Sequence, residues 1–274
     1  MIATIKAEWR KSRFRPAFLV SSGLIGAITV LVYGLQWYQA THPGTARDAI
    51  TPSLLTLYPD QFVNAVMGAG FPLGAAMAIV LGALIAGSEY SWGTVKTTFT
   101  QGPGRLTTWF GRVVVFAAWM GIMTAILFAV GATSSVVVAS FQGHAIAWPA
   151  VVDIAKGIGA IWLVFAVNGA IGLALGVLIR NSAAALGIGL IYVLAVELIA
   201  VRFIDVLNGG AYKWIGNYFV GQNATALLQS FTSPAFGRSL APSIGAEQAV
   251  LVLAAYFAGL VIVAAALVRQ RDVT

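Results

Sequence analysis

Long apolar runs separated by short polar connections dominate this sequence. A helix that crosses a bilayer needs about 20 predominantly apolar residues, and several of the runs reach that length. Inside a bilayer, helices satisfy the hydrogen bonds of their own backbone, so each run is expected to be helical. We therefore predict an all-α polytopic membrane protein in which residues 1–274 form a single transmembrane domain, with six spans at about 17–38, 62–86, 112–138, 152–179, 183–201 and 248–268.

Composition supports a membrane protein. Hydrophobic residues make up 59% of the chain and charged residues only 9%, whereas charged residues are about 25% of a soluble domain. The chain has no cysteine, which excludes a disulfide framework, a cysteine metal site and a thiol nucleophile. Its cations are not clustered on a soluble domain, so nucleic acid is not an expected partner.

The first apolar run could be read as a cleaved signal peptide. The apolar region of a signal peptide is about 7–15 residues long and ends at a small-x-small cleavage site. Residues 17–38 form a longer run, and Tyr38-Gln39-Ala40 does not have that pattern. We interpret the run as an uncleaved first span.

The distribution of Lys and Arg predicts the topology of the six spans. Eleven of the 16 Lys and Arg residues lie in the N-terminal tail, the 87–112 connection, the turn at Arg180 and the C-terminal tail, all on one side of the predicted layout. Cytoplasmic segments carry an excess of Lys and Arg. We expect both termini and the 87–112 connection in the cytoplasm, and the 39–60 and 202–246 connections outside.

A polar stretch follows the second predicted span. Gly87 suits the end of a helix and Ser88 suits the N-cap of a new one. Glu89 would then lie in the first turn and Lys96 near the end, where the helix dipole favours their charges. The stretch is either a short interfacial helix, about Ser88–Thr100, or an ordinary loop with solvated charges.

Two features of the spans predict how they pack. Pro72 lies within the second span and is expected to kink it, which membrane helices tolerate. The pairs Gly70-x-x-x-Gly74 and Gly172-x-x-x-Gly176 should allow close approach of neighbouring helices.

The motifs of several catalytic classes are absent from the sequence. Neither Lys96 nor Lys156 follows a Walker-A glycine loop, and no His-Glu-x-x-His or intramembrane serine–histidine pairing occurs. His42 and His144 lie in predicted outer loops, where we expect exposed histidines rather than a zinc site. We do not expect an enzyme, a metal site or a cofactor in this chain.

Glu197 and Asn168 are polar residues inside predicted spans that could line a pathway. Glu197 is either a carboxylate lining a pathway or gate, or one near the outer interface that is hydrated or paired with Arg202; we favour the second interpretation. Asn168 is either a pathway residue or, as we expect, a hydrogen-bonding partner of a neighbouring helix.

The long connection before the last span is rich in aromatic residues. These side chains would suit the outer membrane interface, where Trp and Tyr are enriched. We predict short interfacial or re-entrant helices in this connection, with a loop lid as the alternative. Its aromatic residues are Phe203, Tyr212, Trp214, Tyr218, Phe219, Phe231 and Phe236.

The polar stretch resembles the cytoplasmic segment that follows the second span of ABC-2 type permeases, the membrane subunits of ATP-driven exporters. The six-span layout, the basic N-terminal tail and the long fifth connection agree with this family. Within it, the chain most resembles small permeases associated with bacteriocin, lantibiotic and bacitracin self-protection. The matching residues are Gly87, Glu89, Tyr90, Gly93, Thr94, Lys96, Arg105 and Arg112.

The resemblance implies that Glu89–Thr100 forms a coupling helix that contacts a separate ATPase subunit, with Glu89, Tyr90, Gly93, Thr94, Lys96 and Arg105 at the contact. It also implies two ATPase subunits, which bind ATP and Mg, and a second permease that is identical or paralogous. The location would be the plasma membrane, and the cargo an amphipathic or hydrophobic substrate. The alternatives are a secondary transporter or channel, or a membrane anchor for a partner. A secondary transporter often carries several intramembrane charges or paired broken helices, whereas here only Glu197 is clearly internal.

Overall fold

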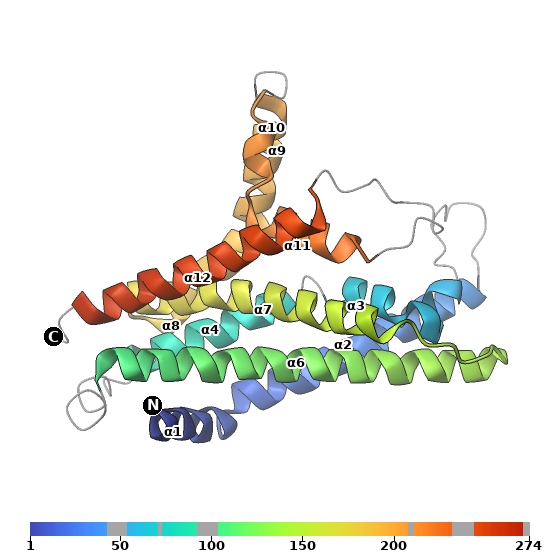
Figure 1. Ribbon diagram of the computed structural model, residues 1–274, viewed down its shortest axis with the longest axis horizontal. Coiled ribbons are helices and arrows are strands. Elements are labelled where there is room, and N and C mark those ends of the chain that lie inside the picture. Colours follow the sequence, from blue (N-terminus) through green and yellow to red (C-terminus); the bar gives the residue numbers. More distant parts are fainter. Residues whose placement is uncertain (43–53, 71–72, 92–103, 208–210, 232–243, 271–274) are drawn as a thin grey trace.

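The described part of the protein is a bundle of long helices. The computed structural model describes residues 1–42, 54–70, 73–91, 104–207, 211–231 and 244–270, and within these ranges it contains helices and turns but no strand. Figure 1 shows that the longest helices run side by side along one axis, with the chain termini at the same end. This arrangement confirms the predicted all-α fold.

The helices follow the predicted order of spans, with additional short helices between them. Two 3₁₀ turns, Leu54–Leu57 and Pro59–Gln61, precede α3, and a π-helical turn, Tyr192–Val196, separates α8 from α9. The α-helices are α1 (Ile2–Arg13), α2 (Pro16–Thr41), α3 (Phe62–Gly70), α4 (Leu73–Ser91), α6 (Arg105–Gln142), α7 (Val151–Ile179), α8 (Ser182–Ile191), α9 (Glu197–Val206), α10 (Lys213–Gly216), α11 (Val220–Gln229) and α12 (Ala246–Gln270).

Five helices among the described residues are long and apolar enough to cross a membrane. They are α2, α6, α7, α12 and the continuous segment Ser182–Ile204 formed by α8, the π turn and most of α9. The segments Pro59–Gly68 and Leu73–Ser88 make a sixth span if they are counted together, and they are bent by 55° relative to each other. The break in the predicted second span is thus present, while Pro72 itself lies outside the described residues.

Helix α6 is longer than the predicted third span, which covered only residues 112–138. It has 38 residues, equivalent to about 57 Å at the rise of an α-helix, whereas the hydrocarbon core of a bilayer is about 30 Å thick. Polar residues at both ends remain helical because no proline interrupts them. Gly143 ends the helix with a φ of 64°, a conformation that glycine adopts without steric cost.

Among the described helices, the most extensive contact is between α4 and α7. A Cβ atom added at Gly172 would overlap the backbone carbonyl of Ile79, and one added at Gly176 would lie 2.9 Å from the Cβ of Ala86. An added Cβ at Gly74 would likewise overlap the Phe165 ring. The prediction that Gly172 and Gly176 allow close helix approach is therefore confirmed.

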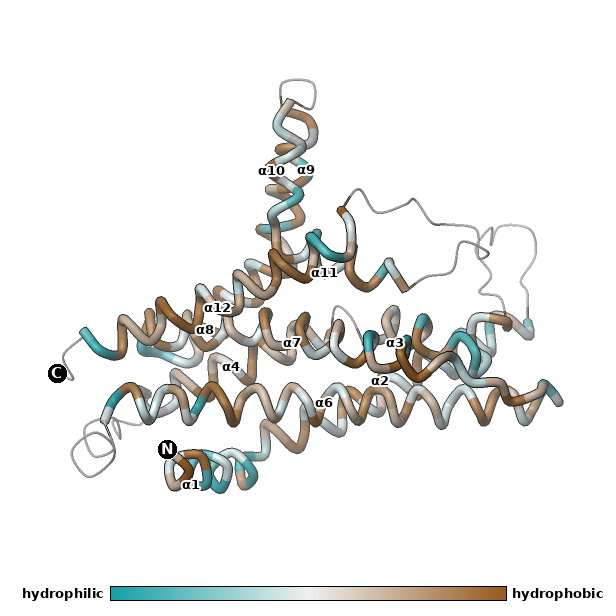
Figure 2. Tube along the Cα trace, viewed as in Figure 1, coloured by the Kyte–Doolittle hydropathy of each residue, from teal (hydrophilic) through white to brown (hydrophobic). Residues whose placement is uncertain are grey.

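Large side chains of α6 occupy the centre of the bundle. Trp109, Phe116 and Met120 are at most 1% exposed, and the indole Nε1 of Trp109 donates a hydrogen bond to the backbone carbonyl of Val261 in α12 at 3.2 Å. Figure 2 shows apolar residues along the bundle helices and a concentration of hydrophilic residues on α1. Helix α1 therefore differs in character from the helices beside it.

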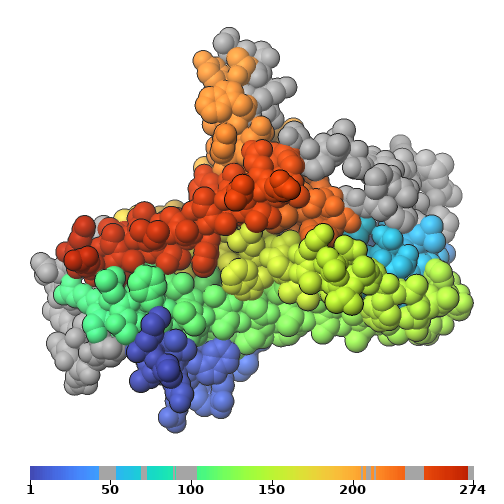
Figure 3. Space-filling view, viewed as in Figure 1, coloured from blue at the N-terminus to red at the C-terminus, as the bar shows by residue number. Residues whose placement is uncertain are grey.

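The predicted short helices are present between α9 and α12. Helix α11 packs against α12 and α7, whereas α9 and α10 form an arm that projects from the bundle (Figures 1 and 3). The arm exposes Phe203, Tyr212 and Trp214. These aromatic side chains are thus exposed on the surface of the protein, and their position at the outer interface stays a prediction.

Candidate functional site

The N-terminal helix α1 packs against the first third of α6. An added Cβ at Gly111 of α6 would lie 3.0 Å from the Cγ2 atom of Thr4, so the absence of a side chain there lets α1 approach. The rings of Trp9 and Trp119 stack with centroids 5.4 Å apart, and the Nε1 atom of Trp119 donates to the Oγ atom of Ser12 at 2.8 Å. Glycine, aromatic stacking and a buried hydrogen bond thus hold α1 in a defined position.

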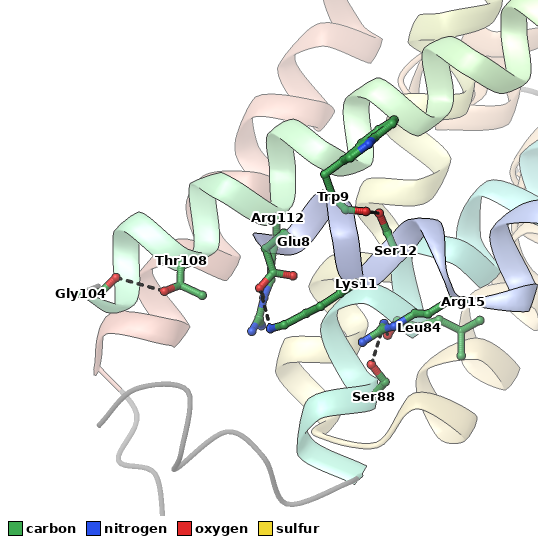
Figure 4. A network of polar contacts seen from close by, with 10 residues as sticks. All are labelled: Glu8, Trp9, Lys11, Ser12, Arg15, Leu84, Ser88, Gly104, Thr108 and Arg112. Atoms are coloured by element: carbon green, nitrogen blue, oxygen red, sulfur yellow. Dashed lines mark hydrogen bonds and ion pairs between the residues drawn. The ribbon is translucent and has the colours of Figure 1, made fainter. Parts of the chain in front are cut away.

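A buried carboxylate connects α1 to α6 electrostatically. The Oε1 atom of Glu8 lies 3.7 Å from the Nε atom of Arg112 and 3.1 Å from the Nζ atom of Lys11. Glu8 is 8% exposed and Arg112 is 5% exposed, and Figure 4 shows them facing each other between the two helices. Charges buried to this extent are stable only when they are paired, so Glu8 and Arg112 specify the docked position of α1.

The junction between α1 and α2 is fastened to α4. The Nη1 atom of Arg15 donates to the carbonyl oxygen of Leu84 at 3.3 Å and to the Oγ atom of Ser88 at 3.0 Å, as Figure 4 shows. Arg15 thereby contacts the end of α4 while Glu8 contacts the beginning of α6. We call this set of contacts the N-terminal clasp; its residues are Thr4, Glu8, Trp9, Lys11, Ser12, Arg15, Leu84, Ser88, Gly111, Arg112 and Trp119.

The predicted helix break at Gly87 is wrong. Helix α4 continues through Gly87 and Ser88 to Ser91. Gly87 is needed for packing instead, because an added Cβ there would lie 2.7 Å from the Cα of Ser182 at the start of α8. Gly87 therefore looked like a helix end in the sequence, but its role is to allow close contact between α4 and α8.

The residues proposed for ATPase coupling are only partly described. Tyr90 lies in the last turn of α4, with the guanidinium of Arg180 5.9 Å from its ring centroid. Arg105 begins α6 and its Nη1 atom donates to the carbonyl oxygen of Arg269 at 3.5 Å. Glu89 is in the last turn of α4, but its side chain is not among the side chains that the structure describes. Residues 92–103 also lie outside the described ranges, and with them Gly93, Thr94 and Lys96.

The segments predicted to share the cytoplasmic side do gather at one end of the bundle. Helix α1 contacts the beginning of α6 through Glu8 and the end of α4 through Arg15. Gly87 contacts the α7–α8 turn, and Arg105 contacts the end of α12. The turn at Arg180 is tight, with a φ of 57°. The side of the membrane that this end faces stays a prediction.

Glu197 has a different partner from the one expected. It is 5% exposed, and its carboxylate accepts a hydrogen bond from the backbone N–H of Gly221 in the first turn of α11. The carboxylate is therefore bound by a backbone amide of α11 rather than by the expected Arg202, and its hydration stays a prediction. Residues five apart on a helix point in different directions, which separates Arg202 from this carboxylate.

Asn168 also has a different hydrogen-bond partner from the one expected. Its side chain is 2% exposed, and its Nδ2 atom donates to the carbonyl oxygen of Val164 one turn earlier in the same helix at 2.9 Å. This hydrogen bond of the amide is thus made within α7 and not to a neighbouring helix. This geometry gives Asn168 a local structural role.

Each of the two histidines lies against the ring of a tyrosine. The rings of His42 and Tyr38 stack with centroids 4.5 Å apart, and His144 meets the edge of Tyr58 at 3.9 Å. Within the described ranges, no group of three or more His, Cys, Asp or Glu residues is arranged to hold a metal ion.

The N-terminal clasp was missed by reasoning from the sequence, which treated residues 1–16 only as a basic tail. Its signal was present as polar residues four apart, Thr4, Glu8 and Ser12, which lie on one face of a helix. Because these residues are polar, the pattern does not resemble an apolar buried face. The partners in α6 lie about a hundred residues away, and nothing in the local sequence connects them.

A known protein family matches most of this chain. Residues 61–274 match the model of a family described as protein of unknown function (DUF2705). The chain belongs to this family. The match includes every described helix from α3 onward, whereas α1 and α2 of this DUF2705 member precede it. No curated protein matches the chain.

Proposed function

We propose that this chain is the membrane-spanning permease subunit of an ATP-driven exporter of the ABC-2 type. A separate ATPase subunit, present in two copies, would bind ATP and Mg and hydrolyse the nucleotide. Two permeases, identical or paralogous, would enclose the pathway in the plasma membrane, with both termini in the cytoplasm. The cargo would be an amphipathic or hydrophobic molecule.

The observation that best supports this proposal is the N-terminal clasp. It joins the end of α4 to the beginning of α6, the two helices that flank residues 92–103. A force applied to that connection would therefore act on both helices and on α1 together. Gly87 extends the joined unit to α8 through its close contact with Ser182.

The mechanism proposed for coupling follows from this joined unit. When the ATPase subunits close, they would press on the connection that contains Glu89, Gly93 and Lys96. The clasp would prevent α4 and α6 from separating, so the movement would tilt both helices. Helix α7 packs closely against α4 and would follow, which would change the pathway between two permeases.

The test is to purify the chain from its native membrane with its ATPase, reconstitute the complex in vesicles, and measure ATP-dependent efflux and substrate-stimulated ATP hydrolysis. Glu89→Ala should reduce both while assembly persists, because a charge-assisted hydrogen bond at a protein contact is worth about 1.5–3 kcal/mol. Gly93→Val should also reduce coupling if this glycine permits close approach of the ATPase.

Asp60→Ala is the matched control, because Asp60 is an exposed carboxylate. It lies directly before α3. Helix α3 begins the predicted second span, at the end opposite the clasp. It should leave efflux unchanged. Purification without any ATPase partner would refute the exporter proposal, and normal efflux in both the Glu89 and Gly93 variants would remove this stretch from the coupling mechanism.

A further inference from the structure

An apolar groove with charges at its mouth lies between α7, α11 and α12. Its volume is about 1030 Å³, large enough for part of a lipid-sized molecule. The apolar wall includes Trp162 and Leu163 of α7, Leu227 of α11 and Leu251 of α12. Figure 1 shows how these three helices converge near the base of the α9–α10 arm.

Three ionisable residues line the mouth of the groove. Asp153 and Lys156 lie in the first two turns of α7, and Glu247 lies in the first turn of α12. All three are exposed. Each acid suits the N-terminus of its own helix, but Lys156 has no such explanation, and in the described part of the chain it forms no ion pair with either carboxylate.

The charges and the apolar wall are separated along the helix axes. Trp162 follows Asp153 by nine residues in α7, which corresponds to roughly 13 Å along the helix. Leu251 follows Glu247 by four residues in α12, or roughly 6 Å. The polarity of the groove therefore changes from charged to apolar along the helix axes, in the same order as a bilayer changes from headgroups to acyl chains.

We propose that this groove binds a membrane phospholipid with a zwitterionic headgroup that carries a primary ammonium group. The ammonium of Lys156 would contact the lipid phosphate, and the carboxylates of Asp153 and Glu247 would contact the lipid ammonium group. One acyl chain would lie against Trp162, Leu163 and Leu251. The mouth carries two negative charges and one positive charge, so a lipid with a phosphate and no cation fits it less well.

This binding does not depend on the permease function, because it needs only the groove and the bilayer. The test uses the full chain purified in detergent, stripped of endogenous lipid and titrated with palmitoyl-oleoyl phosphatidylethanolamine or phosphatidylglycerol. Native mass spectrometry measures the bound lipid. The wild-type chain should bind phosphatidylethanolamine about tenfold more tightly than phosphatidylglycerol, the ratio that corresponds to 1.4 kcal/mol.

The variants separate the two halves of the headgroup. Lys156→Gln should weaken the binding of both lipids, whereas the double variant Asp153→Asn with Glu247→Gln should abolish the preference for phosphatidylethanolamine. Lys6→Gln, at an exposed position of α1, is the control and should change neither. These substitutions are at exposed positions, so they should leave the fold intact, which size-exclusion chromatography checks.

A second variant tests the apolar part of the groove. No atom lies within 4 Å of a Cβ added at Gly159, which lines the groove, so Gly159→Leu should occupy the space of the acyl chain and lower the binding of both lipids. Equal binding of the two lipids by the wild-type chain, a preference for phosphatidylglycerol, or unchanged binding in the Lys156 and Gly159 variants would each overturn the proposal.

Discussion

The Glu197 carboxylate accepts a hydrogen bond from the backbone N–H of Gly221, which stands 24 residues further along the chain. The N–H of the next residue, Gln222, also lies close enough to interact with this carboxylate. Amides in the first turn of a helix have no acceptor within the helix, and the helix dipole favours a negative charge there. Glu197 therefore fixes the beginning of α11 from a position directly after the π-helical turn of its own span.

Glu197→Leu should destabilise the protein by about 1–3 kcal/mol, because it leaves first-turn amides of α11 buried without an acceptor. Glu197→Gln keeps an oxygen acceptor of similar shape and should retain most of the stability. Thermal unfolding of the detergent-purified chain measures the difference. Hydrogen exchange at Gly221 and Gln222 locates it.

A pathway role for Glu197 would instead make the negative charge necessary for transport but not for stability. The Gln variant would then lose transport without losing stability, since only the charge is removed. Equal stability of the Leu variant and the wild-type chain would contradict the capping role derived from the structure.

The contrast between the spans and Glu197 shows what the sequence could reveal. The spans were predictable because apolar length is a property of consecutive residues, and the packing of Gly172 and Gly176 followed from their spacing of four. The partner of Glu197 was not predictable, because Gly221 is distant in sequence and contributes only a backbone N–H. The clasp was missed for the same reason. The sequence shows that Arg112 is a cation, but not that its partner is Glu8.

Gly172→Ala should destabilise the α4–α7 contact by about 1–3 kcal/mol, the usual cost of overpacking. The added Cβ would overlap the backbone carbonyl of Ile79, which cannot move aside as a flexible side chain can. Gly159→Ala on the same helix is the matched control, because no atom lies within 4 Å of its added Cβ. Both variants gain helix propensity, so a lower midpoint of thermal unfolding only for Gly172→Ala isolates the packing effect.

Single cysteines should report opposite sides of the membrane at the two ends of the bundle. The chain contains no cysteine, so each introduced thiol is unique. Lys6→Cys in α1 should resist an impermeant thiol reagent in intact cells and react after permeabilisation. Ala145→Cys, exposed in the α6–α7 connection, should react in intact cells, and the reverse pattern would invert the predicted topology.

Glu8→Ala should loosen α1 from α6, because it leaves the guanidinium of Arg112 buried without its carboxylate partner. Removing one member of a buried pair typically costs about 3–5 kcal/mol. Hydrogen exchange should therefore become faster at the amides of α1 while the centre of α6 stays protected. Lys6→Ala is the control, since Lys6 is exposed on the same helix and such substitutions usually change stability by less than about 0.5 kcal/mol.

A disulfide between α1 and α6 should reverse the effect of Glu8→Ala. The Cβ of Thr4 lies 3.4 Å from the position of a Cβ added at Gly111, close to the usual separation in disulfides of about 3.5–4.5 Å. In the Thr4→Cys, Gly111→Cys background, oxidation should restore slow exchange in α1 even when Glu8 is alanine, and reduction should remove the protection. Pairing Thr4→Cys with Gly121→Cys, roughly 15 Å further along α6, should form no disulfide. If oxidised and reduced forms exchange equally fast, a tether at Gly111 does not hold α1, and its docking depends on other contacts of the clasp, among them the Glu8–Arg112 pair.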